Sequence, residues 1–337
     1  MKPLSPIVSL VVLNWQGEED TARCVESIRA QSCDASIEVI VVDNESTQES
    51  RSKLKAIGDC RLVATPRNLG FAGGMNAGAA VASGDPIGLL NNDLVLASDW
   101  VQRGLELLAA RPDVGMIGGL SYFWDDANPP YSEANDAWSF PIVDPASGAG
   151  TLRQSLGAFT EVSALDGSNL LIRRSLWQRV GGFDADYFAY GEDLDMSARC
   201  SAAGFQLVYE PAMRTWHRRH ASSNRMRLRR AYWSRRNHLY NVAKHFSERE
   251  WRGRTRRLSV DYIWYGVSGR DAGLRARSRS RKLDLRTRCA SLAAGLWGCT
   301  HGHRLANKRR AVVAEGLHDE QWTDKVRQRN LSLVHHD

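Results

Sequence analysis

The chain has 337 residues, of which 43% are apolar and 25% charged, and its formal net charge is +7. These values are ordinary for a soluble globular protein and allow one large domain or two modest ones. No apolar run reaches the roughly 18 residues of a membrane-spanning helix, and the six cysteines form no C-x-x-C pair typical of a zinc module. The first residues lack the charged, apolar and small segments of a secretory signal, so we expect a cytoplasmic protein.

Strand and helix patterns alternate about every 20 residues through the first part of the chain, which predicts an α/β fold with a mainly parallel sheet. The expected strands are 7–13, 37–42, 61–64, 87–90 and 114–118. The expected helices are 18–30, 47–57, a helix opened by the glycine-rich loop 66–76 and reaching 83, and 99–110.

Three of these strands end in an acid or an amide, at Asn14, Asp43 and Asp93. One polar strand end is typical of a turn, and 91–93 also fits a turn that caps the helix beginning near Ser98. The carboxyl ends of parallel strands lie at one edge of a sheet, where ligands bind. Three such ends together predict a ligand site, and Asp93 is a hard oxygen ligand suited to Mg²⁺ or Mn²⁺.

The common nucleotide-binding motifs are absent from the sequence. There is no G-x-x-x-x-G-K-[ST] loop, and no G-x-G-x-x-G follows the first strand, which argues against a nicotinamide or flavin site. Gly70, Gly73 and Gly74 still permit a backbone to approach an anion closely at a helix start. Glycines at such a junction also serve packing alone.

The middle of the chain combines a long irregular stretch with clustered acids. Residues 121–160, with Tyr122, Phe123, Trp124, Trp138 and Phe140, are expected to form a functional loop or a flap facing an acceptor. Strand character returns over 162–172, a short helix follows over 174–183, another runs from 192 to about 203, and a last strand spans 205–209.

Glu192, Asp193 and Asp195 open a helix directly after an aromatic loop. Acids in a first helical turn also serve only to favour the helix dipole. For Asp193, the nearby Phe188 and Tyr190 predict desolvation and a raised pKa, which suits a general base. His217 follows the last strand, although a single histidine is more often structural or solvated.

The C-terminal region is basic and aromatic, with 27 Lys and Arg against 5 Asp and Glu between Arg214 and Arg310. Such helices suit an anionic membrane surface. Nucleic acid or an ordinary solvated surface are the alternative interpretations.

Six ordered segments together resemble glycosyltransferase family 2, and most of all its bacterial rhamnosyltransferase-type branch. They are Val-Val-Leu-Asn-Trp at 11–15, Val-Val-Asp-Asn-Glu-Ser at 41–46, Arg-Asn-Leu-Gly-Phe-Ala-Gly-Gly-Met-Asn at 67–76, Leu-Leu-Asn-Asn-Asp at 89–93, Gly-Gly-Phe-Asp at 181–184 and Tyr-Gly-Glu-Asp-Leu-Asp at 190–195. The resemblance covers roughly residues 6–245 and implies an inverting enzyme of the GT-A fold, Rossmann-like, with a mainly parallel central sheet flanked by helices.

The resemblance also implies a role for individual residues. Asp193 matches the catalytic base, and Asp93 matches the metal-contacting acid of a D-x-D motif whose first position here is Asn91. The diphosphate, water and His217 are expected to complete the shell of the metal, and the acceptor side is expected at Asp166, Gly167 and Glu192. The nucleotide-sugar is expected to contact Asn14, Asp43, Arg67, Asn68, Gly74, Asn76, Asn92 and Asp93.

These residues predict a catalytic domain over 1–222, with a nucleotide-sugar half at 1–120 and an acceptor half at 121–222, and a basic helical region over 223–337. The expected reaction moves a sugar, with L-rhamnose as one candidate, from a dTDP- or UDP-sugar to a cell-envelope glycan or lipid-linked acceptor with Mg²⁺ or Mn²⁺. The expected location is cytoplasmic or peripheral on the inner face of the membrane. A nucleotidyltransferase and a nucleic-acid-binding protein are the alternatives, with nucleic acid not the expected partner.

Overall fold

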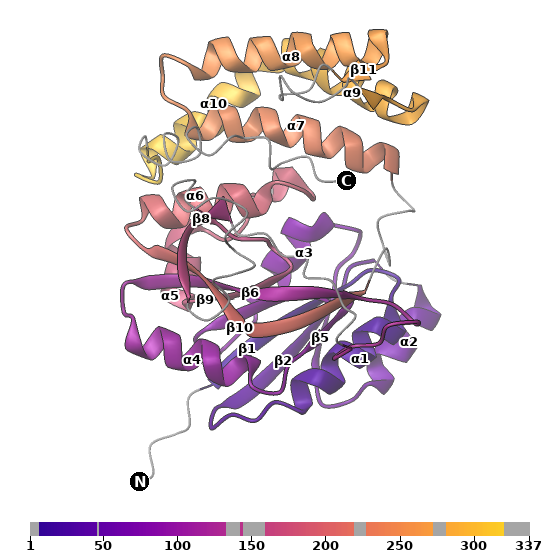
Figure 1. The fold of residues 1–337 in the computed structure, drawn as a ribbon, viewed down its shortest axis with the longest axis vertical. Helices are drawn as coiled ribbons and strands as arrows, with labels where there is room; N and C mark the ends of the chain where they lie inside the picture. The colour runs from indigo at the N-terminus through magenta and orange to yellow at the C-terminus, as the bar shows by residue number, and fades with distance from the viewer. Residues whose placement is uncertain are drawn as a thin grey trace.

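The structure is a computed structural model that describes residues 7–45, 47–132, 142–143, 159–218, 227–271 and 281–319. Most of the expected loop 121–160, including Trp138 and Phe140, lies outside the described residues. So do residues 219–226, where the expected domain boundary falls. Figure 1 shows an α/β body below a layer of helices that comes from the C-terminal part of the chain.

The elements occur in the order that the alternating patterns predict through the first half of the chain. The strands are β1 (Ile7–Asn14), β2 (Ser36–Asp43), β3 (Arg61–Ala64), β4 (Ile87–Asn91), β5 (Leu94–Leu96), β6 (Val114–Trp124), β7 (Ile142–Val143), β8 (Thr160–Ala164), β9 (Asn169–Ile172), β10 (Gln206–Arg218), β11 (Arg270–Asp271) and β12 (Arg281–Lys282). The helices are α1 (Glu18–Arg29), α2 (Gln48–Ala56), α3 (Gly70–Ala79), α4 (Trp100–Ala110), α5 (Arg174–Val180), η2 (Ala185–Tyr187), α6 (Glu192–Ala202), α7 (Arg227–His245), α8 (Trp251–Ser268), α9 (Leu285–Thr300) and α10 (Gly302–Ala314).

The central sheet has the strand order β3-β2-β1-β4-β9-β6-β10-β8-β7, with β5 paired to β10. The longest pairings, β1 with β2 and β6 with β10, are parallel, whereas β9 runs antiparallel between β4 and β6. Since β9 is reversed, β6 and β10 point in the same direction as β1 and β4. The expected mainly parallel sheet flanked by helices is confirmed, although β9 runs in the opposite direction, as do β5 and β8, which pair antiparallel with β10.

Hydrophobic side chains on both faces of the sheet explain why its strands read as continuous apolar runs. In β1, Val8, Leu10 and Val12 enter one core, and the alternate residue Val11 enters the other. Helices α1 and α4 supply side chains to the first core, whereas α3, α5 and α6 supply side chains to the second. The sheet is therefore buried on both sides, and only its edges and strand ends are available to ligands.

Two strands continue beyond their predicted ends, and β5 was not predicted. The strand expected to end at Gly118 continues to Trp124, and the one expected to end at Tyr209 continues to Arg218. Pro211 interrupts the apolar pattern of β10, but a register shift between Glu210 and Arg214 accommodates it against β6. The aromatic residues expected in a loop at 122–124 are therefore strand residues.

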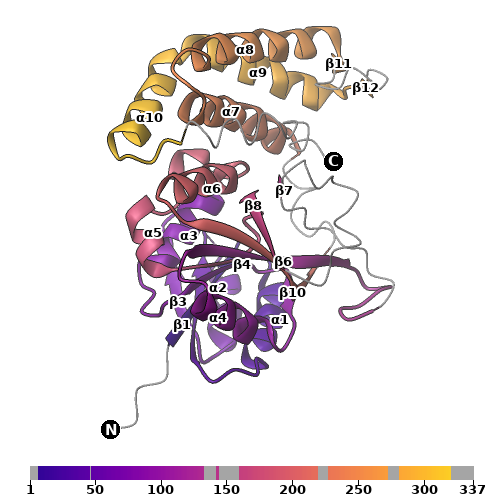
Figure 2. The ribbon, with the colours of Figure 1, turned by 60° about the vertical axis from the view of Figure 1, so that its left-hand side comes forward.

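The C-terminal helices α7 to α10 form a layer with its own hydrophobic core, which includes Leu239, Tyr240, Tyr262 and Leu305. Figures 1 and 2 both place α7 next to α6 of the body and α8 on the far side of the layer. No described helix is both long enough and apolar enough to cross a membrane.

Candidate active site

The polar strand ends lie side by side at one edge of the sheet. Asn14 at the end of β1 is in register with Asp43 at the end of β2, and Leu13 is in register with Asn91 at the end of β4. On the other side of β4, the antiparallel strand β9 begins at this same edge, with Asn169 paired to Leu90. The edge therefore gathers residues that are far apart in the sequence.

Asn14 and Asn92 hold the first of these strand ends to the start of α1. The Asn14 Oδ1 atom accepts hydrogen bonds from the Gly17 backbone N at 3.2 Å and from the Thr21 hydroxyl at 2.9 Å. The Asn92 amide donates to the Gly17 carbonyl at 3.0 Å and to Thr21 Oγ1 at 3.1 Å. These amides therefore fix the local backbone at the expected nucleotide end.

Asp43 is fully buried at the end of β2 and is paired with a cation from the following helix. Its Oδ2 atom accepts a hydrogen bond from Nε of Arg51 at 2.7 Å, and the Arg51 side chain remains one third exposed. Arg51 thus orients the carboxylate and brings a positive charge to this edge of the sheet. Arg51 is not among the residues predicted from the sequence, although its place in the first turn of α2, eight residues after Asp43, is a usable signal.

Asn44 connects the end of β2 to the loop that opens α3. Its amide nitrogen donates to Asn68 Oδ1 at 3.2 Å and to the Gly70 carbonyl at 3.0 Å, and its Oδ1 accepts from the Leu69 N–H at 2.9 Å. Asn68 Oδ1 also accepts from the Gly70 N–H at 2.8 Å. Asn44 is a further residue that the sequence analysis did not assign, and Arg67 lies exposed beside this loop.

Two glycines of α3 are required by close packing. Gly70 has a φ of +72°, and a Cβ there would lie 2.3 Å from the Phe188 carbonyl oxygen. A Cβ on Gly74 would lie 2.4 Å from a methyl carbon of Leu13, so this glycine lets α3 approach the end of β1. A side chain at position 70 would push the loop away from Phe188, and one at position 74 would displace the Leu13 side chain.

Asn76 is on the same helix but its amide is directed to another segment. Its Nδ2 donates to the Phe183 carbonyl at 2.7 Å, and its Oδ1 accepts from the Phe183 N–H at 2.9 Å. The geometry therefore has Asn76 hold α3 against the Gly-Gly-Phe-Asp segment. Asn76 was expected to contact the nucleotide-sugar, but both polar atoms of its side chain bond to the Phe183 backbone.

Asp93, Asn91 and His217 converge where β4 and β10 end. The Asp93 Oδ1 atom lies 3.4 Å from Nε2 of His217, and the Asn91 Nδ2 atom lies 3.2 Å from the same nitrogen. Asp93 is buried. Burial raises the pKa of its carboxyl, whereas the adjacent His217 acts in the opposite direction.

The side chains of Asp93 and His217 fit a divalent cation whose remaining ligands come from the substrate. No three His, Cys, Asp or Glu side chains cluster as a metal site among the described residues. Asp93 and His217 present an oxygen and a nitrogen 3.4 Å apart, close to the separation of two neighbouring ligands of one ion. Mg²⁺ and Mn²⁺ sites are commonly completed by water and substrate phosphates, so two protein ligands are compatible with this chemistry.

Asp193 lies at the start of α6 and contacts the turn between β8 and β9. Its Oδ2 accepts a hydrogen bond from the Gly167 N–H at 3.3 Å, and its Oδ1 accepts from its neighbour's N–H, that of Leu194, at 2.8 Å. The residue after Gly167 is Ser168, whose carbonyl accepts from the Asn91 N–H at 2.9 Å. A two-residue segment therefore connects Asp193 with the strand end that leads to Asp93.

Burial and neighbouring acids raise the pKa values of Asp193 and Glu192 at this turn. Burial is the main cause that raises the pKa of Asp193 to about 6, and the charge of Asp166 adds to it. Burial together with Asp193 raises the pKa of Glu192 well above its ordinary value. The Glu192 Oε2 atom is buried and makes no hydrogen bond to another protein group. Burial of this kind favours the protonated form of the carboxyl.

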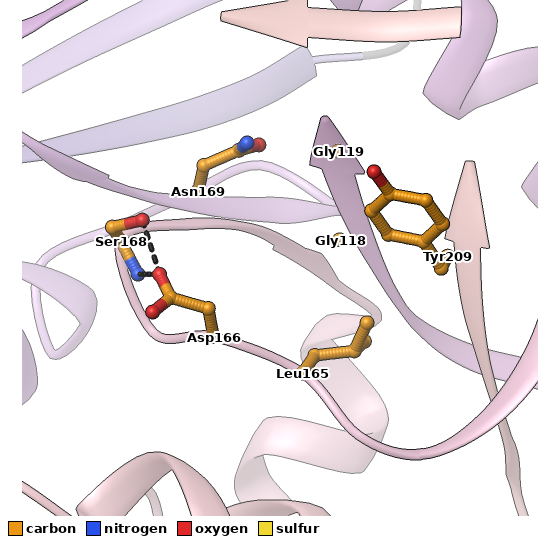
Figure 3. A pocket seen from close by; sticks show the side chains of 7 residues that line it. All are labelled: Gly118, Gly119, Leu165, Asp166, Ser168, Asn169 and Tyr209. Atoms are coloured by element: carbon orange, nitrogen blue, oxygen red, sulfur yellow. Dashed lines mark hydrogen bonds between the residues drawn. The ribbon is translucent and has the colours of Figure 1, made fainter. Parts of the chain in front are cut away.

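Asp166 lies on the same turn and is positioned by it. Its Oδ1 accepts hydrogen bonds from the backbone N–H, at 2.8 Å, and the hydroxyl of Ser168. Figure 3 shows the Asp166 carboxylate directed to Ser168, and both residues line a small cavity together with residues of β6, β9 and β10. The cavity is lined by Gly118, Gly119, Leu165, Asp166, Ser168, Asn169 and Tyr209.

Residues 9–181, just over half of the chain, match the family described as Glycosyl transferase family 2. The chain belongs to this family. The family resemblance carried by the six ordered segments is therefore confirmed.

Two bacterial proteins are similar in sequence to this member of glycosyl transferase family 2. An N-acetylglucosaminyl-diphospho-decaprenol L-rhamnosyltransferase of Mycobacterium tuberculosis is 30% identical over 220 residues, which cover 56% of this chain and 69% of the relative. An uncharacterised protein of Sinorhizobium fredii is 27% identical over 236 residues, which cover 65% of this chain. The matched region spans only 25% of the length of that second relative.

Solved structures support the fold of this family 2 chain. A mannosyltransferase of Pyrobaculum calidifontis in complex with GDP-mannose and Mn²⁺ matches 98% of this chain and 86% of its own at a TM-score of 0.50, with 15% identity. The structure of GalNAc-T7 with UDP, GalNAc and Mn²⁺ covers 70% of this chain and 50% of its own at a TM-score of 0.53, with 15% identity. At this level of identity the likeness concerns the arrangement of elements alone, which is that of the expected GT-A fold.

Proposed function

We propose that the protein is an inverting glycosyltransferase that moves a sugar from a nucleoside-diphosphate sugar to an acceptor hydroxyl. The observation that carries the proposal is the connection from Asp193 through Gly167 and Ser168 to Asn91. It connects a carboxylate whose pKa is about 6 with the strand end that carries Asp93 and His217, the residues proposed to hold a cation. Direct displacement needs a base on one side of the sugar and a stabilised leaving group on the other.

The proposed donor site extends from Asp43 to Asp93 along the sheet edge. Asp43 is oriented by Arg51, and its carboxylate is the group expected to accept a hydrogen bond from a pyrimidine base. Asn14 lies between these acids and is expected near the base or ribose. Asn68 and Gly74 support the adjoining loop, and the exposed Arg67 is available to an anionic ligand.

Asp193 is the proposed catalytic base. Its carboxylate removes the proton of the acceptor hydroxyl, and the resulting oxygen nucleophile forms a bond to the anomeric carbon. The bond from that carbon to the diphosphate oxygen breaks, its electron pair leaves with the nucleoside diphosphate, and the anomeric configuration is inverted. Glu192, Asp166 and Gly167 lie around the base and are proposed to face the acceptor.

Asp93 and His217 are the residues proposed to hold the cation, Mg²⁺ or Mn²⁺. When bound, such an ion supplies positive charge that stabilises the leaving diphosphate. The Asn91 amide lies against the same ring nitrogen of His217, so this contact gives way when that nitrogen binds the ion, and Asn91 contributes no charge of its own. The two neighbouring folds solved with Mn²⁺ support the choice of metal.

The relatives support a more specific substrate pair. The Mycobacterium tuberculosis relative is named for transfer of L-rhamnose to a decaprenol-linked sugar, and a Haloferax volcanii relative for transfer of glucuronic acid to a dolichyl phosphate sugar. We propose a dTDP- or UDP-sugar, with L-rhamnose as the first candidate, and a cell-envelope glycan or lipid-linked acceptor. The domain division at 222 and 223 is part of this proposal, as is contact of the basic region with the inner face of the cytoplasmic membrane.

Ligand-induced thermal stabilisation and donor hydrolysis test the proposal together. UDP, dTDP and their sugars are expected to raise the melting temperature in the presence of Mn²⁺, because they bind the folded state. Asp193→Asn is expected to retain this stabilisation and to lose about 10²–10⁴-fold in sugar transfer, the range of a general base. Asp34→Asn, an exposed acid before β2, is the matched control and should retain full activity.

Two results would overturn the proposal. One is the absence of stabilisation and hydrolysis with every UDP-, dTDP- and GDP-sugar tried. The other is unchanged transfer by Asp193→Asn with a donor that does bind.

A further inference from the structure

Helix α8 leaves apolar side chains exposed on the side that faces away from the rest of the protein. Trp264 is 60% exposed, Val267 61% and Val260 54%. The spacing of three and four residues places these three on one face of the helix. Figures 1 and 2 both show α8 as the outermost element of the C-terminal layer.

Helix α9 packs directly beside α8 and adds two more exposed apolar residues, Leu285 and Leu296. A Cβ on Gly295 would lie 2.5 Å from the Ser259 carbonyl oxygen, so the inner faces of the two helices are already in close contact. The exposed residues therefore do not belong to the interface between the helices. Five of the eleven exposed large apolar residues in the described part of the chain lie on these two helices.

Arginines precede this apolar face along α8, and two of them, Arg252 and Arg254, pair with Glu248 and Glu250. The first half of α8 carries Arg252, Arg254, Arg256 and Arg257, all exposed, whereas the whole helix contains a single acid, Asp261. Long arginine side chains can hold their charge at a polar boundary while their stems cover apolar surface. Tryptophan likewise favours a boundary that is apolar on one side and wet on the other.

We propose that this outer face docks on the surface of an anionic phospholipid bilayer. The outer face is defined as Val260, Trp264 and Val267 of α8, Leu285 and Leu296 of α9, and the four arginines of α8. The inference rests on the proposed function, since an acceptor anchored in lipid would have to be reached at the bilayer surface. Beyond the proposed function, the inference specifies that α8 and α9 make the contact and that the lipid is anionic.

The composition of the face favours a bilayer over two other occupants. A second copy of the chain docked by the same face would bring like charges of the arginines together. Nucleic acid is bound through its phosphates by basic and polar groups, and it would leave the valine and leucine side chains uncovered. An anionic bilayer offers phosphate to the arginines and an apolar boundary to the other side chains.

Sedimentation with vesicles tests the inference on the full chain. We expect binding to phosphatidylglycerol/phosphatidylcholine vesicles and much weaker binding to phosphatidylcholine alone. The double variant Val260→Ser/Trp264→Ala should reduce the affinity about tenfold, because binding scales with buried apolar area. The double variant Arg256→Gln/Arg257→Gln should reduce it about 30-fold, at roughly 1 kcal/mol for each basic residue near the surface.

Matched controls lie on the body of the protein. Ile7→Ser and Arg103→Gln remove an exposed apolar and an exposed basic side chain from β1 and α4, and they should leave vesicle binding unchanged. All of these variants should retain hydrolysis of a soluble donor, because none of the changed residues belongs to the candidate active site.

Equal binding of the parent and the two double variants to anionic vesicles would overturn the inference. It would also fail if the same variants abolished a dimer in sedimentation velocity, or binding to random DNA, while no vesicle binding occurred. If vesicle binding fails while donor hydrolysis is intact, the proposed function is unaffected. Vesicle binding without any binding of a sugar donor would overturn the proposed function, but the outer face would still be supported as a membrane-binding surface.

Discussion

Asp193 and Asp195 are two residues apart on α6, yet their surroundings set their acidity in opposite directions. Burial and Asp166 raise the pKa of Asp193 to about 6. Asp195 is buried as well, but Arg199, Lys244 and His245 hold its pKa well below the ordinary value. Only Asp193 can therefore exchange a proton near neutral pH, whereas Asp195 stays ionised and acts in the structure.

The pH dependence of sugar transfer should report the ionisation of Asp193. A base works when it is deprotonated, so kcat/KM should rise about tenfold per pH unit below a pKa of about 6 and level off above it. Asp166→Asn removes a negative neighbour and should shift this profile to lower pH. An identical profile for the two proteins would show that another group titrates.

Asp193→Asn should also change stability in a pH-dependent way. The folded-state pKa of Asp193 lies above its unfolded value, so ionising the group destabilises the fold. The penalty is absent below about pH 4, grows between pH 4 and 6 and is constant above that range. We expect the variant to unfold about 1–3 kcal/mol less readily at pH 8 and equally at pH 4, as measured by urea denaturation. A gain that is independent of pH would contradict this account.

At the scale of elements, helix α7 holds the loop that precedes the candidate base. The Asn237 amide nitrogen donates to the carbonyls of Tyr187 at 2.9 Å, Ala189 at 2.9 Å and Tyr190 at 2.6 Å. In this loop Phe188 and Tyr190 have φ values of 64° and 72°, which side chains other than glycine rarely adopt. The Phe188 carbonyl in turn accepts from the Ala72 N–H at the start of α3. The loop thus connects α7, α3 and the start of α6.

Asn237→Ala should loosen this loop. Losing the amide removes three hydrogen bonds to carbonyls of the loop, at a cost of about 1–3 kcal/mol in the free energy of unfolding. We expect a lower kcat with nucleoside-diphosphate binding largely retained, because Asp193 follows the loop whereas Asp43 and Asn14 are held by other contacts. Asn307→Ala, an exposed amide on α10, is the control. Equal loss of kcat and of nucleotide affinity would point to general unfolding instead.

At the scale of the whole molecule, a buried ionic network joins the body to the C-terminal helices. Lys244 of α7 is 2% exposed and lies 2.6 Å from Asp195 and 3.1 Å from Asp184. Lys308 of α10 lies 2.7 Å from the same Asp184. The acids come from the body and the lysines from the C-terminal region, so the charge asymmetry seen along the sequence is compensated at this contact.

Lys244→Met should destabilise the protein severely. It leaves two buried acids with fewer cations, and breaking a buried ion pair typically costs about 3–5 kcal/mol. Thermal unfolding should show a large fall in melting temperature, whereas Lys53→Met, which breaks the exposed pair with Glu49, should leave the melting temperature almost unchanged. Equal effects of the two substitutions would mean that the network contributes no more than a surface pair.

Much of the body could be predicted from the sequence because its information is local. Continuous apolar runs of β-branched residues predict strands buried on both faces, and their polar ends at Asn14, Asp43 and Asp93 predict one edge of a parallel sheet. The continuation of β10 beyond Pro211 could not be predicted from the sequence, because the register shift that accommodates the proline depends on pairing with β6. The roles of Arg51 and Asn44 could not be predicted from the sequence, because they depend on contacts with Asp43 and with the loop that opens α3.

The sequence by itself determined the family, the alternation of strands and helices and the acids available for chemistry. Only the tertiary structure decided which of those acids act together, since the Asp193–Gly167 and Ser168–Asn91 contacts join segments separated by tens of residues. It also decided that Asp195 is a structural ion and that Trp264 faces outward. The physical reason is that proton affinity and exposure depend on neighbours brought together by folding, whereas periodicity and strand ends are written along the chain.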